Sequence, residues 1–122
     1  MLAPFRHMVG STRYSLQGIG VLVREMAARI EIGAFVLALG VLAIISAPLR
    51  HWIIVIMMFL ILLAVEALNT AIEVIVDKIS PEHSDFARDA KDLGSAGVFF
   101  TVIATAVYWG AAVLDTLGVI AF

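Results

Sequence analysis

The chain alternates long apolar runs with short charged segments. One uncharged run covers residues 32–49, and another covers residues 93–114. Between them, a run that starts at residue 52 is wholly apolar through Val65 and continues in helical register to residue 77. Each run approaches or exceeds the ~20 residues that an α-helix needs to cross a bilayer. The pattern predicts three transmembrane helices, 32–49, 52–77 and 93–114, in a single domain spanning residues 1–122.

The first 31 residues have a different pattern. Apolar residues recur there at helix-like spacing, and four arginines and two glutamates are interspersed among them. This mixture is typical of an amphipathic helix that lies on a membrane surface. An ordinary polar tail is the alternative interpretation of the segment.

Composition agrees with the membrane interpretation. Apolar residues make up 62% of the chain and charged residues 15%, whereas a soluble domain has roughly half and a quarter. So small a soluble protein does not bury this much apolar surface. We therefore expect an all-α membrane protein. The net charge of −2 gives no indication of a nucleic-acid partner, and the absence of cysteine excludes disulfides and thiolate metal sites.

Basic residues predict the orientation in the membrane. The N-terminal segment holds four arginines, and the loop after the second span holds Lys78, Arg88 and Lys91, whereas the opposite side has only Arg50. With three spans, the two basic regions lie on the same side. The positive-inside rule places that side, with the N-terminus, in the cytoplasm.

The second span carries a polar stripe. Glu66, Asn69, Glu73 and Asp77 fall on one face of a helix whose other faces are apolar. Because lipid does not tolerate such a stripe, it must face protein or water. Carboxylates at this spacing suit a Mg²⁺ site, and a buried carboxylate suits a general base. Hydrogen bonding between helices is the structural alternative.

The loop that follows has its own polar residues. Ser80 and Pro81 resemble a helix start, with serine as the N-cap and proline as the first helical residue. Lys91 lies just before the third span, where it suits either a phosphate contact or an interfacial lysine that extends toward water. Gly94 and Gly97 are small enough to permit close helix packing.

Common phosphate-binding motifs are absent. The sequence contains no P-loop and no set of protein-kinase motifs. Its three histidines are scattered, and their spacing gives no indication of a histidine metal site. Any phosphoryl chemistry in this chain therefore requires an unusual fold.

Residues 66–77, which read EALNTAIEVIVD, resemble the signature of the prokaryotic diacylglycerol kinase family. Residues 90–96, which read AKDLGSA, are similar to the family's next block. At the N-terminus, Tyr14 with Ser15, Gly18, and Glu25 followed by Glu31 are also similar to the family pattern. The resemblance covers nearly the whole chain.

The resemblance implies a homotrimeric enzyme of the bacterial inner membrane. Each subunit has a surface helix and three spans, and neighbouring subunits share active sites near the cytoplasmic face. The implied reaction transfers the γ-phosphoryl group of MgATP to a hydroxyl of diacylglycerol and gives phosphatidic acid. The implied partners are therefore ATP, a lipid substrate, the membrane and copies of the chain itself, with Mg²⁺ as the cofactor.

The resemblance also implies roles for individual residues. Glu66 is the implied general base, Glu25 and Glu73 hold Mg²⁺ at the nucleotide, and Asn69 and Asp77 support the site. Further residues implied at the nucleotide are Arg6, Tyr14, Glu82, His83, Ser84, Lys91 and Asp92. The residues implied at the lipid are Arg6, Glu66 and Ser95.

The sequence departs from the family pattern around Tyr14. No tryptophan follows Ser15, and the spacing to Glu25 is one residue short, which leaves the role of Tyr14 open. Some family members phosphorylate undecaprenol, which is the alternative acceptor. A small proton-coupled transporter is an alternative of another class, since it would explain Glu66 alone. A non-catalytic subunit that uses the small residues for packing is a third.

Overall fold

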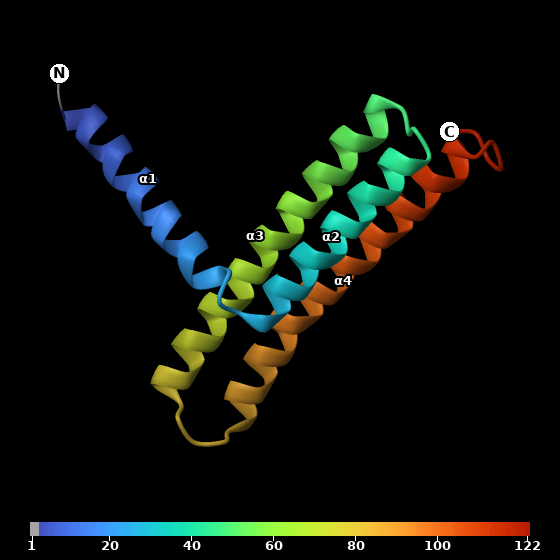
Figure 1. Cartoon of the computed structure of the whole chain (residues 1–122). Helices are drawn as coiled ribbons and strands as arrows, with labels where there is room; N and C mark the ends of the chain where they lie inside the picture. The colour runs from blue at the N-terminus through green and yellow to red at the C-terminus, as the bar shows by residue number, and fades with distance from the viewer. Residues whose placement is uncertain (1–2) are drawn as a thin grey trace.

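The computed structural model describes the backbone of residues 3–122 and the side chains of residues 10–122. It contains four helices: α1 (Ala3–Leu22), α2 (Met26–Ile44), α3 (Leu49–Ile79) and α4 (Asp85–Thr116) (Figure 1). All regular structure in the described part of the chain is helical, which confirms the all-α prediction. By length and composition, α2, α3 and α4 are suited to cross a membrane.

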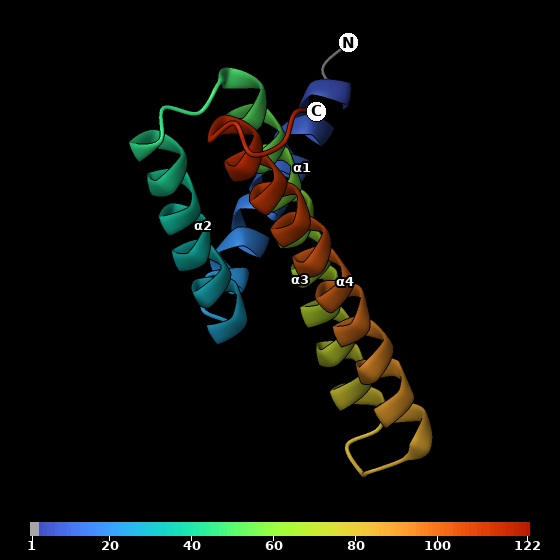
Figure 2. The same cartoon turned by 90° about the vertical axis from the view of Figure 1, so that its right-hand side faces the viewer.

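Helices α3 and α4 form the central hairpin of the fold. They run antiparallel and pack against each other extensively, and a short loop connects them (Figures 1 and 2). The loop end of this hairpin extends beyond α2, which covers only the other part of it. The rings of Phe35 and Phe59 stack at 3.8 Å between α2 and α3. Trp109 Nε1 donates a hydrogen bond to the carbonyl oxygen of Ala38 at 3.2 Å, which ties α4 to α2.

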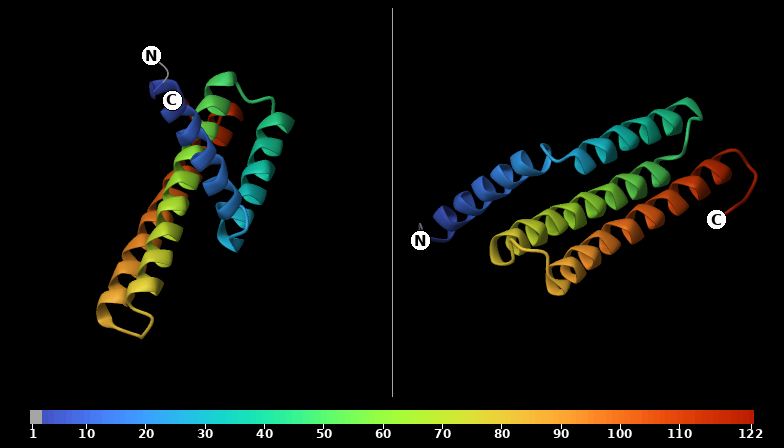
Figure 3. Two further views of the ribbon diagram at one scale, coloured as in Figure 1. Left: turned by 90° about the vertical axis from the view of Figure 1, so that its left-hand side faces the viewer. Right: turned by 90° about the horizontal axis from the view of Figure 1, so that it is seen from below.

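Helix α1 diverges from this bundle. It contacts α3 near the bend into α2 and then leads away (Figures 1 and 3). The surface segment predicted to reach residue 31 is thus divided: α1 ends at Leu22, Glu25 has an extended backbone, and α2 begins at Met26. Arg6 and Arg13 therefore lie on α1, whereas Arg29 and Glu31 lie in the first turns of α2. Placement of α1 on the membrane surface stays a prediction.

Both ends of the first predicted span differ from expectation. Helix α2 begins at Met26 instead of residue 32, so that Arg29 and Glu31 belong to it, and it ends at Ile44 instead of residue 49. Ser46 has a positive φ of 56° in the turn that follows. Pro48 does not end α2 but is the N-cap of α3, where its fixed φ suits a helix start.

The predicted helix start at Ser80 and Pro81 is wrong. Ser80 is the C-cap of α3, and α4 begins at Asp85 with Ser84 as its N-cap. The Ser84 hydroxyl accepts a hydrogen bond from the Ala87 backbone N–H at 3.1 Å. This bond satisfies one of the amides that an α-helix leaves unpaired at its first turn.

A buried polar cluster joins α3 and α4 at the end opposite their loop. His51 is fully buried, its Nδ1 lies 3.0 Å from the Tyr108 hydroxyl, and its Nε2 lies 2.8 Å from Asp115 Oδ2. Arg50 also pairs with Asp115, and the ring of Phe122 packs against His51 and Tyr108. Sequence reasoning missed this cluster because it treated the histidines as scattered.

The cluster generates a stability prediction. His51→Leu removes both ring hydrogen bonds at similar volume: the part-buried Tyr108 hydroxyl loses its partner on α3, and Asp115 keeps only Arg50 and the Phe122 amide. We expect it to lower the free energy of unfolding by about 1–3 kcal/mol. The measurement is unfolding of the protein in mixed micelles by titration with sodium dodecyl sulfate, followed by circular dichroism.

The matched control is His83→Leu, the same substitution at an exposed loop position. It should change the free energy of unfolding by less than about 0.5 kcal/mol. Equal effects of the two substitutions would contradict a stabilising role for the cluster.

Candidate functional site

The polar stripe of α3 runs from a buried to an exposed environment. Glu66 is 4% exposed and Asn69 is 9% exposed, whereas Glu73 and Asp77 are exposed. At 1.5 Å per residue, Glu73 lies about 10 Å further along the helix than Glu66, toward the loop. The stripe therefore leads from the interior of the bundle to its loop end.

Acidic side chains from three parts of the chain interact with Glu66. Glu25 comes from the bend before α2, Glu31 from the first turns of α2, and Glu73 from α3; each of them interacts electrostatically with Glu66. Glu31 Oε2 is buried without a hydrogen-bond partner. Because like charges repel one another, the ionised carboxylates of this cluster disfavour one another.

Glu31 had no predicted role, although its spacing from Glu25 contributed to the family resemblance. It also lines a cavity of about 530 Å³ between α2, α3 and α4. Of the described residues that line this cavity, Glu31 alone is charged, and the others are mostly apolar. A carboxylate within the apolar run of α2 was the sequence signal that pointed to it.

Asn69 connects the stripe to α4. Its Nδ2 donates a hydrogen bond to Glu73 Oε1 at 3.0 Å, one turn further along α3. Its Oδ1 is buried, has no hydrogen-bond partner and lies against Gly94 of α4. The amide thus orients a carboxylate of the predicted metal site.

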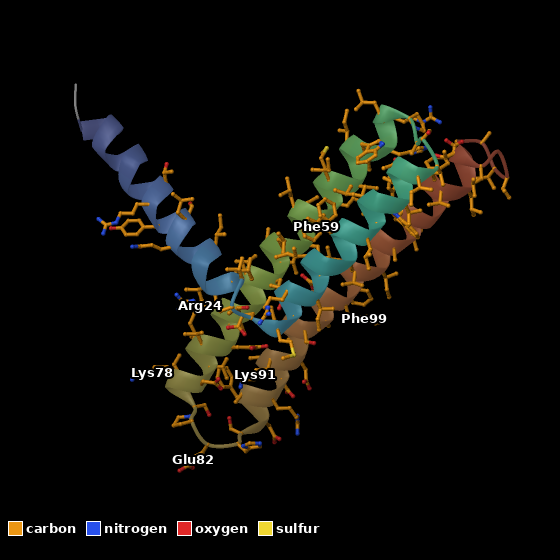
Figure 4. The ribbon with its side chains drawn as sticks, viewed as in Figure 1. Arg24, Phe59, Lys78, Glu82, Lys91 and Phe99 are labelled. Carbon is orange, nitrogen blue, oxygen red and sulfur yellow. The ribbon has the colours of Figure 1, made fainter. Side chains whose placement is uncertain are left out.

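A second cavity, of about 390 Å³, lies at the loop end of the hairpin. Its size is in the usual range of ligand pockets. Figure 4 shows Glu82 and Lys91 at this end of the hairpin. The structure brings together here five residues predicted at the nucleotide, namely Glu82, His83, Ser84, Lys91 and Asp92.

Lys91 and Asp77 form an ion pair in this cavity. Lys91 Nζ lies 2.5 Å from Asp77 Oδ1, and the two side chains are 40% and 66% exposed. The pair joins the end of α3 to the start of α4. An anionic ligand in the cavity would meet the lysine charge beside this carboxylate.

The donor set fits Mg²⁺ that is shared with a phosphate ligand. Among the described side chains, no group of three or more histidine, aspartate or glutamate residues is arranged to hold a metal ion. Mg²⁺ commonly uses only one or two carboxylates, with substrate phosphates and water as its other ligands. Glu25 and Glu73 are exposed carboxylates that both interact electrostatically with Glu66, and two carboxylates suffice for such a shared site.

Two predicted site residues, Tyr14 and Ser95, do not line the loop cavity. Tyr14 is exposed on α1, which leads away from the hairpin, and Ser95 is exposed on α4 (Figure 1). The Arg6 side chain lies outside the described side chains. A single chain therefore brings together the acidic cluster and the loop cavity, without Tyr14.

Comparison with known proteins identifies the family. The model of the prokaryotic diacylglycerol kinase family matches residues 13–113, most of the chain. The chain belongs to the prokaryotic diacylglycerol kinase family. Its three apolar helices and this membership make it a membrane protein.

The similarity to named relatives extends over most of the chain. A diacylglycerol kinase of Sinorhizobium sp is 41% identical over 103 residues, which is 84% of this chain and 75% of the relative. A diacylglycerol kinase of Haemophilus influenzae is 33% identical over 105 residues, 85% of this chain and 89% of the relative. A diacylglycerol kinase of Escherichia coli K12 is 30% identical over 106 residues, 86% of this chain and 87% of the relative.

The exposure of the Lys91–Asp77 pair generates a prediction for this diacylglycerol kinase family member. Because exposed ion pairs contribute little to stability, Lys91→Met should change the free energy of unfolding by less than about 1 kcal/mol. Unfolding in mixed micelles measures this change in free energy. The control is Arg88→Met, which breaks the exposed pairs to Asp85 and Asp89. A much larger loss for Lys91→Met would show that the lysine holds the hairpin together.

Proposed function

We propose that this chain is a lipid kinase that transfers the γ-phosphoryl group of MgATP to a hydroxyl of diacylglycerol and gives phosphatidic acid. One observation carries the proposal: the buried acid Glu66 lies on the same helical stripe that leads to a polar cavity at the loop end. Family membership and the names of the relatives support it.

The depth of each group suits the two substrates. A lipid hydroxyl lies at the membrane interface, and ATP arrives from water. Glu66 is the deeper, buried group, and Lys91 with the loop residues lies at the open end. The lipid hydroxyl therefore meets Glu66 while the nucleotide occupies the loop cavity.

Glu66 acts as the general base. Its carboxylate accepts the proton of the lipid hydroxyl as the oxygen attacks the γ-phosphorus. A bond forms between the lipid oxygen and that phosphorus, and the bond from the γ-phosphorus to the β–γ bridging oxygen breaks, so that ADP leaves. A positioned base contributes typically 10²- to 10⁴-fold to a rate.

Glu25 and Glu73 are the residues that would hold Mg²⁺ at the nucleotide. Bound Mg²⁺ supplies neutralisation of the phosphate charge, which is a main requirement of phosphoryl transfer. Asn69 keeps the Glu73 carboxylate in place through its hydrogen bond. Lys91 contributes positive charge from the opposite helix, and Asp77 holds the lysine where the nucleotide enters.

The remaining parts of the proposal concern assembly. Arg6 and Tyr14 belong to α1, which leads away from the hairpin of its own chain, and a homotrimer with shared sites brings them to a neighbouring chain. Ser95 contacts the lipid. The active site faces the cytoplasm at a bacterial inner membrane; the basic residues of the N-terminal segment and the loop support this orientation.

Glu66→Gln tests the general base. We expect this nearly isosteric change to reduce turnover about 10²- to 10⁴-fold, because glutamine accepts no proton. The measurement is phosphoryl transfer from labelled ATP in mixed micelles with Mg²⁺, with diacylglycerol and undecaprenol supplied separately. Asp89→Asn, an exposed acid outside both clusters, is the control and should keep wild-type turnover.

The outcomes of this assay separate the alternatives. If the wild type phosphorylates diacylglycerol and Glu66→Gln does not, the result supports both the kinase activity and the role of Glu66 as general base. Product only on undecaprenol assigns the chain to the other acceptor. No Mg²⁺-dependent product on either lipid, from folded protein, would overturn the kinase proposal in favour of a proton-coupled transporter.

Glu73→Gln separates a kinase from a packing subunit. The change removes a metal-binding charge at an exposed position but keeps an oxygen that accepts the Asn69 hydrogen bond. We expect the Mg²⁺ concentration for half-maximal turnover to rise about tenfold or more, which is the loss of a charged ligand, with stability unchanged. Activity is measured against Mg²⁺ and stability by unfolding in micelles; loss of stability with an unchanged Mg²⁺ requirement would contradict the assignment.

A further inference from the structure

Gly94 stands in the interior of α4, where glycine weakens a helix relative to alanine. A Cβ built at this position would overlap Asn69 Oδ1 of α3, far inside van der Waals contact. A Cβ at Gly97, about one turn later, would meet only Val65 Cγ1, at an ordinary 3.7 Å. A Cβ at position 94 would therefore force the Asn69 amide to move, whereas a Cβ at position 97 would leave its neighbour in place.

The space left by the missing side chain of Gly94 favours one orientation of the Asn69 amide. Asn69 Oδ1 is buried against Gly94 without a conventional donor, and Nδ2 donates to Glu73 Oε1 at 3.0 Å. In the opposite orientation the amide oxygen would face the Glu73 carboxylate, and the NH₂ group would face a CH₂ group that accepts no hydrogen bond. The Cα–H groups of glycine are weak partners for the oxygen.

We propose that Gly94 is a positioning residue for phosphoryl transfer: by leaving space for the Asn69 amide, it fixes the Glu73 carboxylate at the MgATP site. This role rests on the proposed kinase function. A side chain at position 94 displaces the amide, and Glu73 then loses the hydrogen bond from Asn69 and its fixed orientation. The lipid hydroxyl and its base, Glu66, are not contacted by Gly94.

Gly94→Ala tests the role. Because the loss of a hydrogen bond to a charged group is involved, we expect the KM for MgATP to rise about tenfold to hundredfold. The KM for diacylglycerol should change little. The dissociation constant of MgATP, taken from its stabilisation of the protein against heat in micelles, should rise in parallel and gives a readout even where turnover is slow.

Gly97→Ala is the matched control, with the same substitution in the same helix, and should keep wild-type values. A double-mutant cycle provides the second test. In an Asn69→Ala background the clash is gone, so Gly94→Ala should cause no further loss of MgATP binding. If the two substitutions acted independently, their losses of MgATP binding would instead add.

Each outcome decides the proposal. A wild type that transfers no phosphoryl group and does not bind MgATP overturns the kinase function and, with it, this role. An active wild type with unchanged MgATP parameters in Gly94→Ala, or with additive effects in the cycle, overturns the positioning role alone. If Gly94→Ala does not fold, recovery of folding in Gly94→Ala with Asn69→Ala supports the contact, and failure of this pair to fold overturns the proposal.

Discussion

The need to keep carboxylates away from lipid governs the rest of this structure. A charged side chain at the centre of a lone spanning helix costs about 2.5–3.5 kcal/mol on insertion scales, and α3 carries several polar groups on one face. The fold buries the deepest of them, Glu66 and Asn69, within the bundle and leaves Glu73 and Asp77 open near the loop. A gradient of exposure along one helix follows from this single requirement.

Burial of the polar stripe depends on how closely α3 and α4 pack. Different interactions hold the two helices together at the two ends of the hairpin. At the end opposite the loop, buried His51 joins Asp115 and Tyr108, and no ligand reaches the bonds of its ring without opening the helices. At the loop end, the Asp77–Lys91 pair is largely exposed and lines a cavity. The hairpin therefore has one fixed end and one end whose ion pair an anionic ligand can reach.

Sequence periodicity predicted the helices and the stripe, because a stripe on one helix depends only on local geometry. It did not predict the cluster at His51, whose partners lie 57 and 64 residues away, because such contacts depend on how two helices are aligned. Gly94 was likewise attributed only to packing, since nothing local shows that Asn69 faces it. The misplaced start of α4 has a local cause: two serines in the same loop both suit an N-cap, and Ser84 is the one whose hydroxyl receives the Ala87 amide.

The same constraint bears on assembly. In the single chain, Glu73 and Ser95 are exposed on helices apolar enough to cross a membrane, and α1, which carries the exposed Tyr14, leads away from the bundle. Lipid is a poor environment for an open carboxylate on a spanning helix. A second copy of the chain would cover that face better than lipid does, because its α1 carries both charged and apolar residues. The exposed carboxylate thus supports the proposed oligomer on physical grounds, separately from family resemblance.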